Sequence, residues 1–178
     1  RCKKCSKPVM NEEQEYCFDC SGKKFSYISG RALFEYNKEM KQSISEYKFH
    51  AKKEYVDFYV EEMLQHYKTW ISDIEPDVIL PVPLHKSKRR QRGFNQAELL
   101  AKGLGKELHI PVITDFLIRE KNTVPQKLLD NKERARNLKH AFKMSDKYSK
   151  GNQMLYASKA LLVDDIYTTG TTIDLCSK

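Results

Sequence analysis

The sequence lacks any apolar run close to the length of about 18 residues that a membrane-spanning helix needs, so no membrane span is expected. No basic and then apolar leader stands at its beginning, although a chain that starts at Arg1 can have lost one by processing. Internal repeats and low-complexity segments are also missing. With 40% hydrophobic residues among 178, the chain is long enough for one sizeable core plus a small appended module.

Acidic residues are outnumbered by basic ones, at 24 Asp and Glu against 32 Lys and Arg, which gives a formal net charge of +8. Such an excess favours an anionic partner, with nucleic acid, a nucleotide or a phosphorylated substrate all eligible. The alternative is that the charge serves solubility alone.

Cysteine is scarce after the first twenty residues. Four of the five cysteines lie within those twenty residues, as CKKC (Cys2 to Cys5) and CFDC (Cys17 to Cys20). Two such pairs, eleven residues apart, can present four thiolates to one tetrahedral zinc ion. We therefore predict a zinc ribbon or knuckle over residues 1–25, with a structural metal because protein fills all four positions. Two disulfides in a secreted domain are the alternative. The single leftover Cys176 better suits a reducing, cytoplasmic location.

Residues 26–178 carry a mixed pattern of helix and strand signals. Aromatic and apolar residues from Tyr55 to Trp70 recur at helical spacing, which predicts an amphipathic helix with these side chains in the core. A second helix is expected from a cap at Asn95 to Leu108. Strands are predicted at 77–83, 111–113, 116–119, 141–144 and 159–163. Their alternation with helices favours an α/β fold with a parallel sheet, in which ligands bind beyond the carboxyl ends of the strands.

The segment ALLVDDIYTTGTT, residues 160–172, lies at such an end. A buried strand is followed by Asp164 and Asp165, and then by a threonine-rich turn around Gly170 that starts a helix. Free backbone N–H groups and hydroxyls in such a turn can hold a phosphate. The two carboxylates can accept hydrogen bonds from vicinal sugar hydroxyls or hold a hydrated Mg²⁺. This order predicts a site for a phosphorylated sugar, and the alternative is a purely structural turn with aspartate caps.

The same segment resembles the phosphoribosyl pyrophosphate (PRPP) motif of type I phosphoribosyltransferases. PVPLHKSKRRQRGFNQ at 81–96 and TVPQKLLDNKERARNLKHAF at 123–142 are similar to the ComF family of competence proteins, of which a four-cysteine knuckle is also a hallmark. The sequence departs from the family at Lys88, Leu128 and His140. A helix and a strand that the fold would add after Lys178 are absent, so we expect the chain to be incomplete.

The resemblance implies a type I phosphoribosyltransferase-like domain over residues 26–178. Asp164 and Asp165 would contact the ribose hydroxyls of PRPP, which binds with Mg²⁺. Its 5′-phosphate would be held by Thr168, Thr169, Gly170, Thr171 and Thr172. The pyrophosphate loop would be formed by Pro81, Val82, Pro83 and Leu84, and the lid by residues 120–137 with Arg134. No catalytic base and no nucleobase-reading motif is identified.

The resemblance further implies a role in natural transformation, in which the protein handles single-stranded DNA in the cytoplasm beside a ComFA-type ATP-driven translocase. Two other hypotheses remain open. The protein could be a working phosphoribosyltransferase of nucleotide metabolism, or an adaptor whose knuckle docks a protein partner and whose pocket is vestigial.

Two basic segments are candidates for contact with DNA: KSKRRQR at 86–92 and SEYKFHAKK at 45–53. Cations can neutralise backbone phosphates, and aromatic rings can stack on unpaired bases. The candidate residues are Lys86, Lys88, Arg89, Arg90, Arg92, Tyr47 and Lys48. As alternatives, the first segment serves PRPP alone or is a solvated face, and Tyr47 belongs to the core.

Overall fold

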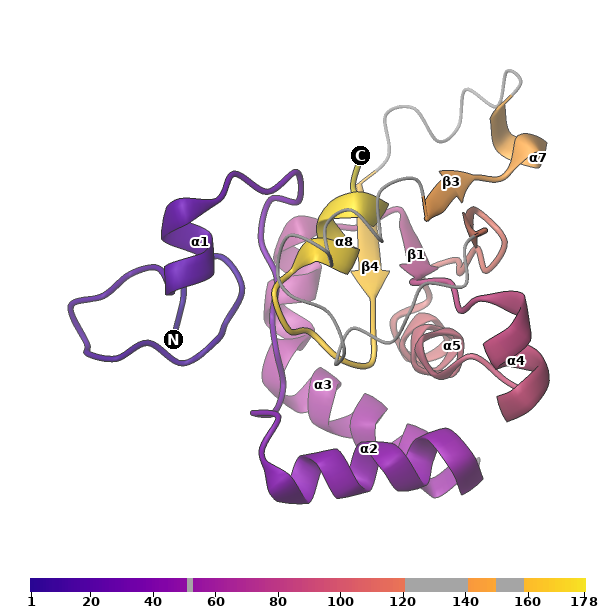
Figure 1. Ribbon diagram of the computed structural model, residues 1–178, viewed down its shortest axis with the longest axis horizontal. Helices are drawn as coiled ribbons and strands as arrows, with labels where there is room; N and C mark the ends of the chain where they lie inside the picture. The colour runs from indigo at the N-terminus through magenta and orange to yellow at the C-terminus, as the bar shows by residue number, and fades with distance from the viewer. Residues whose placement is uncertain (51–52, 121–140, 150–158) are drawn as a thin grey trace.

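The computed structural model describes residues 1–50, 53–120, 141–149 and 159–178 (Figure 1). Its helices are α1 (Phe18–Gly22), α2 (Lys38–His50), α3 (Lys53–Ile74), α4 (Lys86–Arg92), α5 (Gln96–Leu108), α7 (Asp146–Ser149) and α8 (Thr171–Cys176). Its strands are β1 (Val78–Pro81), β2 (Leu117–Arg119), β3 (Phe142–Met144) and β4 (Ala160–Val163). The predicted helices are confirmed as α3 and α5. Within these ranges, no helix combines the length and the apolar character needed to cross a membrane.

A small parallel sheet lies at the centre of the fold. β1 pairs with β4, and on its other side Ile79 forms a single parallel bridge with Val112, where a strand was predicted. The register places Pro81 opposite Val163, and the Val82 N–H donates to the Val163 carbonyl at 2.8 Å. The carboxyl ends of β1 and β4 therefore meet at the same edge, as expected for a parallel pair.

β2 and β3 form a second, antiparallel pair, in which Leu117 lies opposite Met144. The sequence favoured a parallel sheet, and β1 with β4 forms one, whereas these two strands pair separately and antiparallel. Lys143 and Met144 are exposed, so β3 has a side in water. An antiparallel pair tolerates that exposure, whereas purely parallel sheets are covered on both faces.

The core is formed where α5 packs against β1 and β4, with α3 packed on α5. Its largest buried side chains include Tyr47 of α2, Ile79 of β1 and Leu104 of α5, and Tyr59 of α3 is only 3% exposed. The aromatic stripe of α3 therefore contributes to the core, as its spacing predicts.

Asn95 stands at the N-cap position of α5, as predicted, but its side chain makes no capping hydrogen bond. Instead, its Nδ2 donates to the Val82 carbonyl at 3.0 Å. Because Val82 follows β1, this buried bond fixes the loop between strand and helix. It thereby holds the segment predicted to bind pyrophosphate next to the end of β4.

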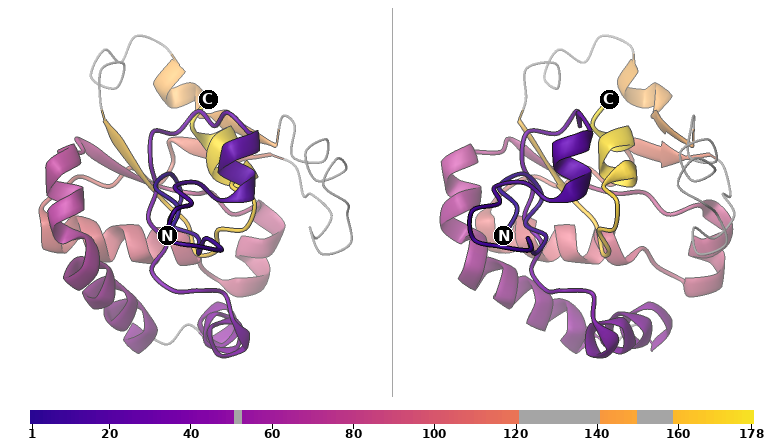
Figure 2. Two further views of the ribbon diagram at one scale, coloured as in Figure 1. Left: turned by 90° about the vertical axis from the view of Figure 1, so that its left-hand side faces the viewer. Right: turned by 60° about the vertical axis from the view of Figure 1, so that its left-hand side comes forward.

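The cysteine knuckle, residues 1–25, lies at one end of the molecule, and α4 and α7 lie at the other (Figure 1). The views of Figure 2, in which the knuckle side comes forward, draw α1 in front of the region of α8, whereas Figure 1 shows the two helices apart. The segment after α1 makes the link, because the Ser26 N–H donates to Asp174 Oδ1 in α8 at 2.7 Å. The start of the chain therefore packs against the helix that follows the predicted phosphate turn.

Candidate functional site

Asp164 and Asp165, the acid pair, lie directly after β4, beside the end of β1. Asp164 Oδ1 accepts a hydrogen bond from the Asp165 N–H at 2.9 Å. A cavity of about 200 Å³ opens at this point. Its lining includes the acid pair, Lys48, Tyr167 and the predicted phosphate residues Thr168, Gly170, Thr171 and Thr172. The fold thus gathers most of the predicted motif around one hollow.

The turn after the acid pair depends on Gly170, which has a left-handed φ of 78°. A Cβ atom there would lie 2.5 Å from the Tyr167 hydroxyl. Glycine therefore suits this position both because of its left-handed backbone and because a side chain would clash with Tyr167. The Thr169 and Thr171 hydroxyls lie 2.9 Å apart and share a hydrogen bond. The Asp174 N–H donates to the Gly170 carbonyl at 2.9 Å, which joins the turn to α8.

Lys48 belongs to this site rather than to an outer surface. Its Nζ lies 2.9 Å from Asp165 Oδ2, and the two side chains are only 16% and 17% exposed. Lys48 was named from the sequence as a candidate for contact with DNA, and the structure places its side chain at the acid pair. An ion pair of this kind is shielded from solvent and neutralises one of the two carboxylates.

Tyr47, another DNA-binding candidate, belongs to the core, which was the alternative for this residue. Its side chain is 0% exposed, and its Oη donates to the Gln96 carbonyl at 2.9 Å. The ring lies in the core and cannot stack on a nucleic-acid base in this arrangement. Tyr47 thus packs against α5 while the adjoining Lys48 contacts the acid pair.

The acid pair has an unusual electrostatic balance. Burial and the charge of Asp165 raise the pKa of Asp164 to about 7, although the positive charges of Lys48 and Arg119 oppose this shift. Arg119, at the end of β2, was not predicted as a site residue. The site is therefore a carboxylate pair among fixed cations, which is suited to a ligand that brings both hydroxyls and negative charge.

The KSKRRQR segment forms α4. Some of its cations are exposed to solvent, and others are partly buried. Lys86, Arg89 and Arg90 are exposed, with Arg89 paired to Glu98 at 3.2 Å. Burial lowers the pKa of the Lys88 ammonium, and the nearby charges of Arg119 and Arg92 lower it further. Lys88 is thus within electrostatic reach of the acid pair.

The four residues of the predicted pyrophosphate loop lie where β1 ends. Pro81 and Val82 are buried, whereas Pro83 and Leu84 are partly exposed. His85 follows as the N-cap of α4, and its Nδ1 accepts from the Ser87 N–H. The predicted lid is described only at Glu120, whose N–H donates to the Ala141 carbonyl; residues 121–137, including Arg134, lie outside the described residues.

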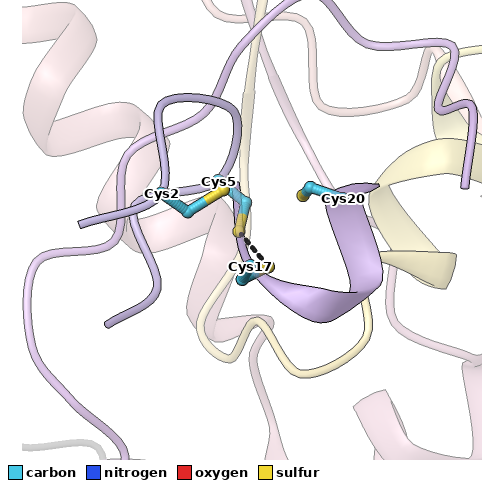
Figure 3. Close-up of side chains that lie close together, drawn as sticks. All are labelled: Cys2, Cys5, Cys17 and Cys20. Atoms are coloured by element: carbon cyan, nitrogen blue, oxygen red, sulfur yellow. Dashed lines mark hydrogen bonds between the residues drawn. The ribbon is translucent and has the colours of Figure 1, made fainter. Parts of the chain in front are cut away.

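The four N-terminal cysteines converge (Figure 3). Their Sγ atoms all lie within 4.8 Å of one another, and those of Cys5 and Cys17 are 3.6 Å apart. A tetrahedral ion with Zn–S bonds of about 2.3 Å requires sulfurs about 3.8 Å apart, so this set fits a zinc ion. All cysteines are free thiols, and Cys176 stands apart from the cluster.

Comparison with known proteins identifies relatives of this chain. The chain is 43% identical over 103 residues to competence protein F of Haemophilus influenzae, covering 58% of this chain and 43% of that protein. It is 31% identical over 183 residues to the competence protein ComFC of Streptococcus pneumoniae, covering 99% of this chain and 72% of that protein. The chain belongs to the ComFC family of competence proteins.

A differently named relative matches over a shorter stretch. The DNA utilization protein YhgH of Escherichia coli is 37% identical over 98 residues, covering 55% of this chain and 40% of that protein. The chain spans about half the length of the first curated relatives it matches. No protein-family model and no solved structure matches it.

Proposed function

We propose that this protein is a competence accessory protein for DNA uptake that binds PRPP and single-stranded DNA and acts with a ComFA-type ATP-dependent translocase. One observation carries the PRPP assignment: the register of β1 with β4 brings the predicted pyrophosphate loop to the same sheet edge as the acid pair. The names of the ComFC relatives support the competence role.

The ligand chemistry agrees with the charges at this edge. Asp164 and Asp165 would accept hydrogen bonds from the ribose hydroxyls, and their oxygens are the ligand type that Mg²⁺ prefers. The turn around Gly170 would hold the 5′-phosphate. Lys48 would leave Asp165 as ribose binds and pair instead with pyrophosphate, which exchanges one ion pair for another at little electrostatic cost.

Calorimetric titration of the protein with PRPP in the presence of Mg²⁺ tests this assignment. We expect micromolar binding, and we expect the double variant Asp164→Asn/Asp165→Asn to abolish it, because neutral amides lose the charge-assisted hydrogen bonds to the ribose. An unchanged affinity in the double variant would show that PRPP binds elsewhere. A wild-type protein without affinity for PRPP would contradict the proposal itself.

The DNA-binding part of the proposal rests on the exposed face of α4. Lys86, Arg89 and Arg90 point into solvent on a helix of seven residues, and this face lies beside the inward cations that surround the acid pair. Exposed cations bind backbone phosphates and release counterions, which makes the affinity depend on salt. Single-stranded DNA would follow this face regardless of its sequence.

Arg90→Ala is expected to weaken binding of a single-stranded oligonucleotide about threefold to tenfold at low salt and to reduce the salt slope by about one. Fluorescence anisotropy over a series of NaCl concentrations measures both quantities. Lys106→Ala is the matched control, because Lys106 is an exposed cation near the far end of α5. Equal losses in the two variants would indicate only a general charge effect and would remove α4 as the DNA site.

A further inference from the structure

The cysteine knuckle packs on the turn that was predicted to hold the 5′-phosphate, and the contact runs through two tyrosines. We infer that Tyr27 and Tyr167 position this turn, so that metal binding at the four cysteines and PRPP binding at the turn strengthen each other. The inference rests on the proposed PRPP function. It gives the knuckle a role in ligand binding although none of its residues lines the cavity around the acid pair.

The contact is short and largely buried. Tyr27 Oη and Tyr167 Oη lie 2.8 Å apart and share a hydrogen bond, and the side chain of Tyr27 is only 8% exposed. Tyr167 belongs to the PRPP motif, yet its ring packs against the cluster formed by the cysteines. Lys7 Nζ lies 5.6 Å from the centre of the Tyr167 ring, which adds a cation–π contact from the knuckle.

Three consecutive residues clamp the turn from the knuckle side. Phe25 covers Gly170, because a Cβ built on that glycine would lie 3.2 Å from Phe25 Cε1. The Ser26 N–H bonds to Asp174 of α8 at 2.7 Å, and Tyr27 bonds to Tyr167. The turn is therefore held at its beginning, at its glycine and at the helix that follows.

The knuckle in turn depends on its cysteines. Residues 1–25 are too few to bury an adequate core, and a module of this size is expected to keep its shape only when metal joins its thiolates. The Gly30 N–H donates to the Lys4 carbonyl at 2.7 Å, so the segment that carries Tyr27 is itself tied to the first cysteine loop. Loss of metal would free this segment and with it the clamp.

A turn that is already ordered binds its ligand more tightly than a mobile one, because less conformational entropy is lost when the ligand binds. Thermodynamic linkage then makes the effect reciprocal: if metal raises the affinity for PRPP by a given factor, PRPP raises the affinity for metal by the same factor. This reciprocity separates a positioning role from a merely structural one, for which zinc retention would not respond to PRPP.

The test compares wild-type protein with Tyr27→Phe, which removes one hydroxyl, and with Tyr16→Phe, an equal change at a tyrosine of the knuckle that is 43% exposed. Calorimetry measures the affinity for PRPP with Mg²⁺. A chromogenic chelator measures zinc release with and without PRPP. Hydrogen exchange measures protection of the amides at 166–172 in zinc-loaded and zinc-stripped protein without PRPP.

We expect Tyr27→Phe to weaken PRPP binding about fivefold, the effect of one net hydrogen bond, and Tyr16→Phe to leave it unchanged. PRPP is expected to slow zinc release from wild-type protein and to do so less in Tyr27→Phe. Zinc removal should lower protection at 166–172, and added zinc should restore it.

The outcomes separate the inference from the function on which it rests. Wild-type protein that binds no PRPP overturns the proposed function and the PRPP linkage with it. Wild-type protein that binds PRPP equally well with and without zinc, and whose turn amides keep their protection after zinc removal, overturns the inference alone. Equal effects of Tyr27→Phe and Tyr16→Phe would also overturn it.

Discussion

Replacing Asp164 with asparagine is expected to raise Tm at pH 8 and at the same time to remove PRPP binding. Burial and the charge of Asp165 raise the pKa of Asp164 to about 7, so the folded protein favours the neutral acid and bears a cost when the group ionises. Asparagine removes that cost. A gain of about 1 kcal/mol corresponds to a rise in Tm of about 2 to 4 °C for a chain of this size.

The sign of the pH dependence makes this prediction specific. A folded-state pKa above the unfolded value means that the stabilising contribution of Asp164 is complete below about pH 4 and is lost as the pH rises toward 7. The stability gain of Asp164→Asn should therefore be present at pH 8 and shrink progressively toward pH 4. Thermal unfolding of wild-type protein and variant over this pH range measures it.

Asp165→Asn is the matched control, because Asp165 forms the 2.9 Å ion pair with Lys48. Removing this carboxylate leaves a largely buried lysine without its partner, so we expect Tm to fall rather than rise. A gain in Asp164→Asn that was the same at pH 5 and pH 8 would contradict an origin in the ionised carboxylate. A cost of this kind is typical of functional sites, where stability is given up for binding.

Features with a local cause could be predicted from the sequence. The two cysteine pairs, the strand before Asp164 and the helix from Asn95 each depend on residues close together in the chain, and all three are present. The meeting of β1 with β4 also followed from a general rule, since parallel strands align their carboxyl ends.

Features that depend on packing between distant segments could not be predicted. SEYKFHAKK has the composition of a nucleic-acid contact, but Tyr47 is buried against α5 and Lys48 pairs with Asp165, more than a hundred residues away. The same holds for Tyr27 and Tyr167, whose hydroxyls meet across 140 positions of the chain. Periodicity and charge pattern describe one segment at a time and carry no signal for such pairs.

The largest effect on metal content is expected for Cys17→Ser. Cys17 is 7% exposed, and its Sγ lies 3.6 Å from that of Cys5, so serine removes one of four converging ligands. Structural zinc sites depend on the complete ligand set, and we expect zinc to fall from about one per chain to nearly none. Emission spectroscopy of the purified protein measures the metal, and limited proteolysis measures unfolding of residues 1–25.

Cys176→Ser provides the control, because it changes the fifth cysteine, which lies in α8 outside the cluster. It should keep its zinc. The main core, built from α2, α3, α5, β1 and β4, contains none of the four clustered cysteines, so the helical signal of Cys17→Ser should largely persist while the knuckle becomes sensitive to protease. Full zinc content in Cys17→Ser would contradict a four-cysteine site, and global unfolding would show that the knuckle supports the whole fold rather than the turn around Gly170 alone.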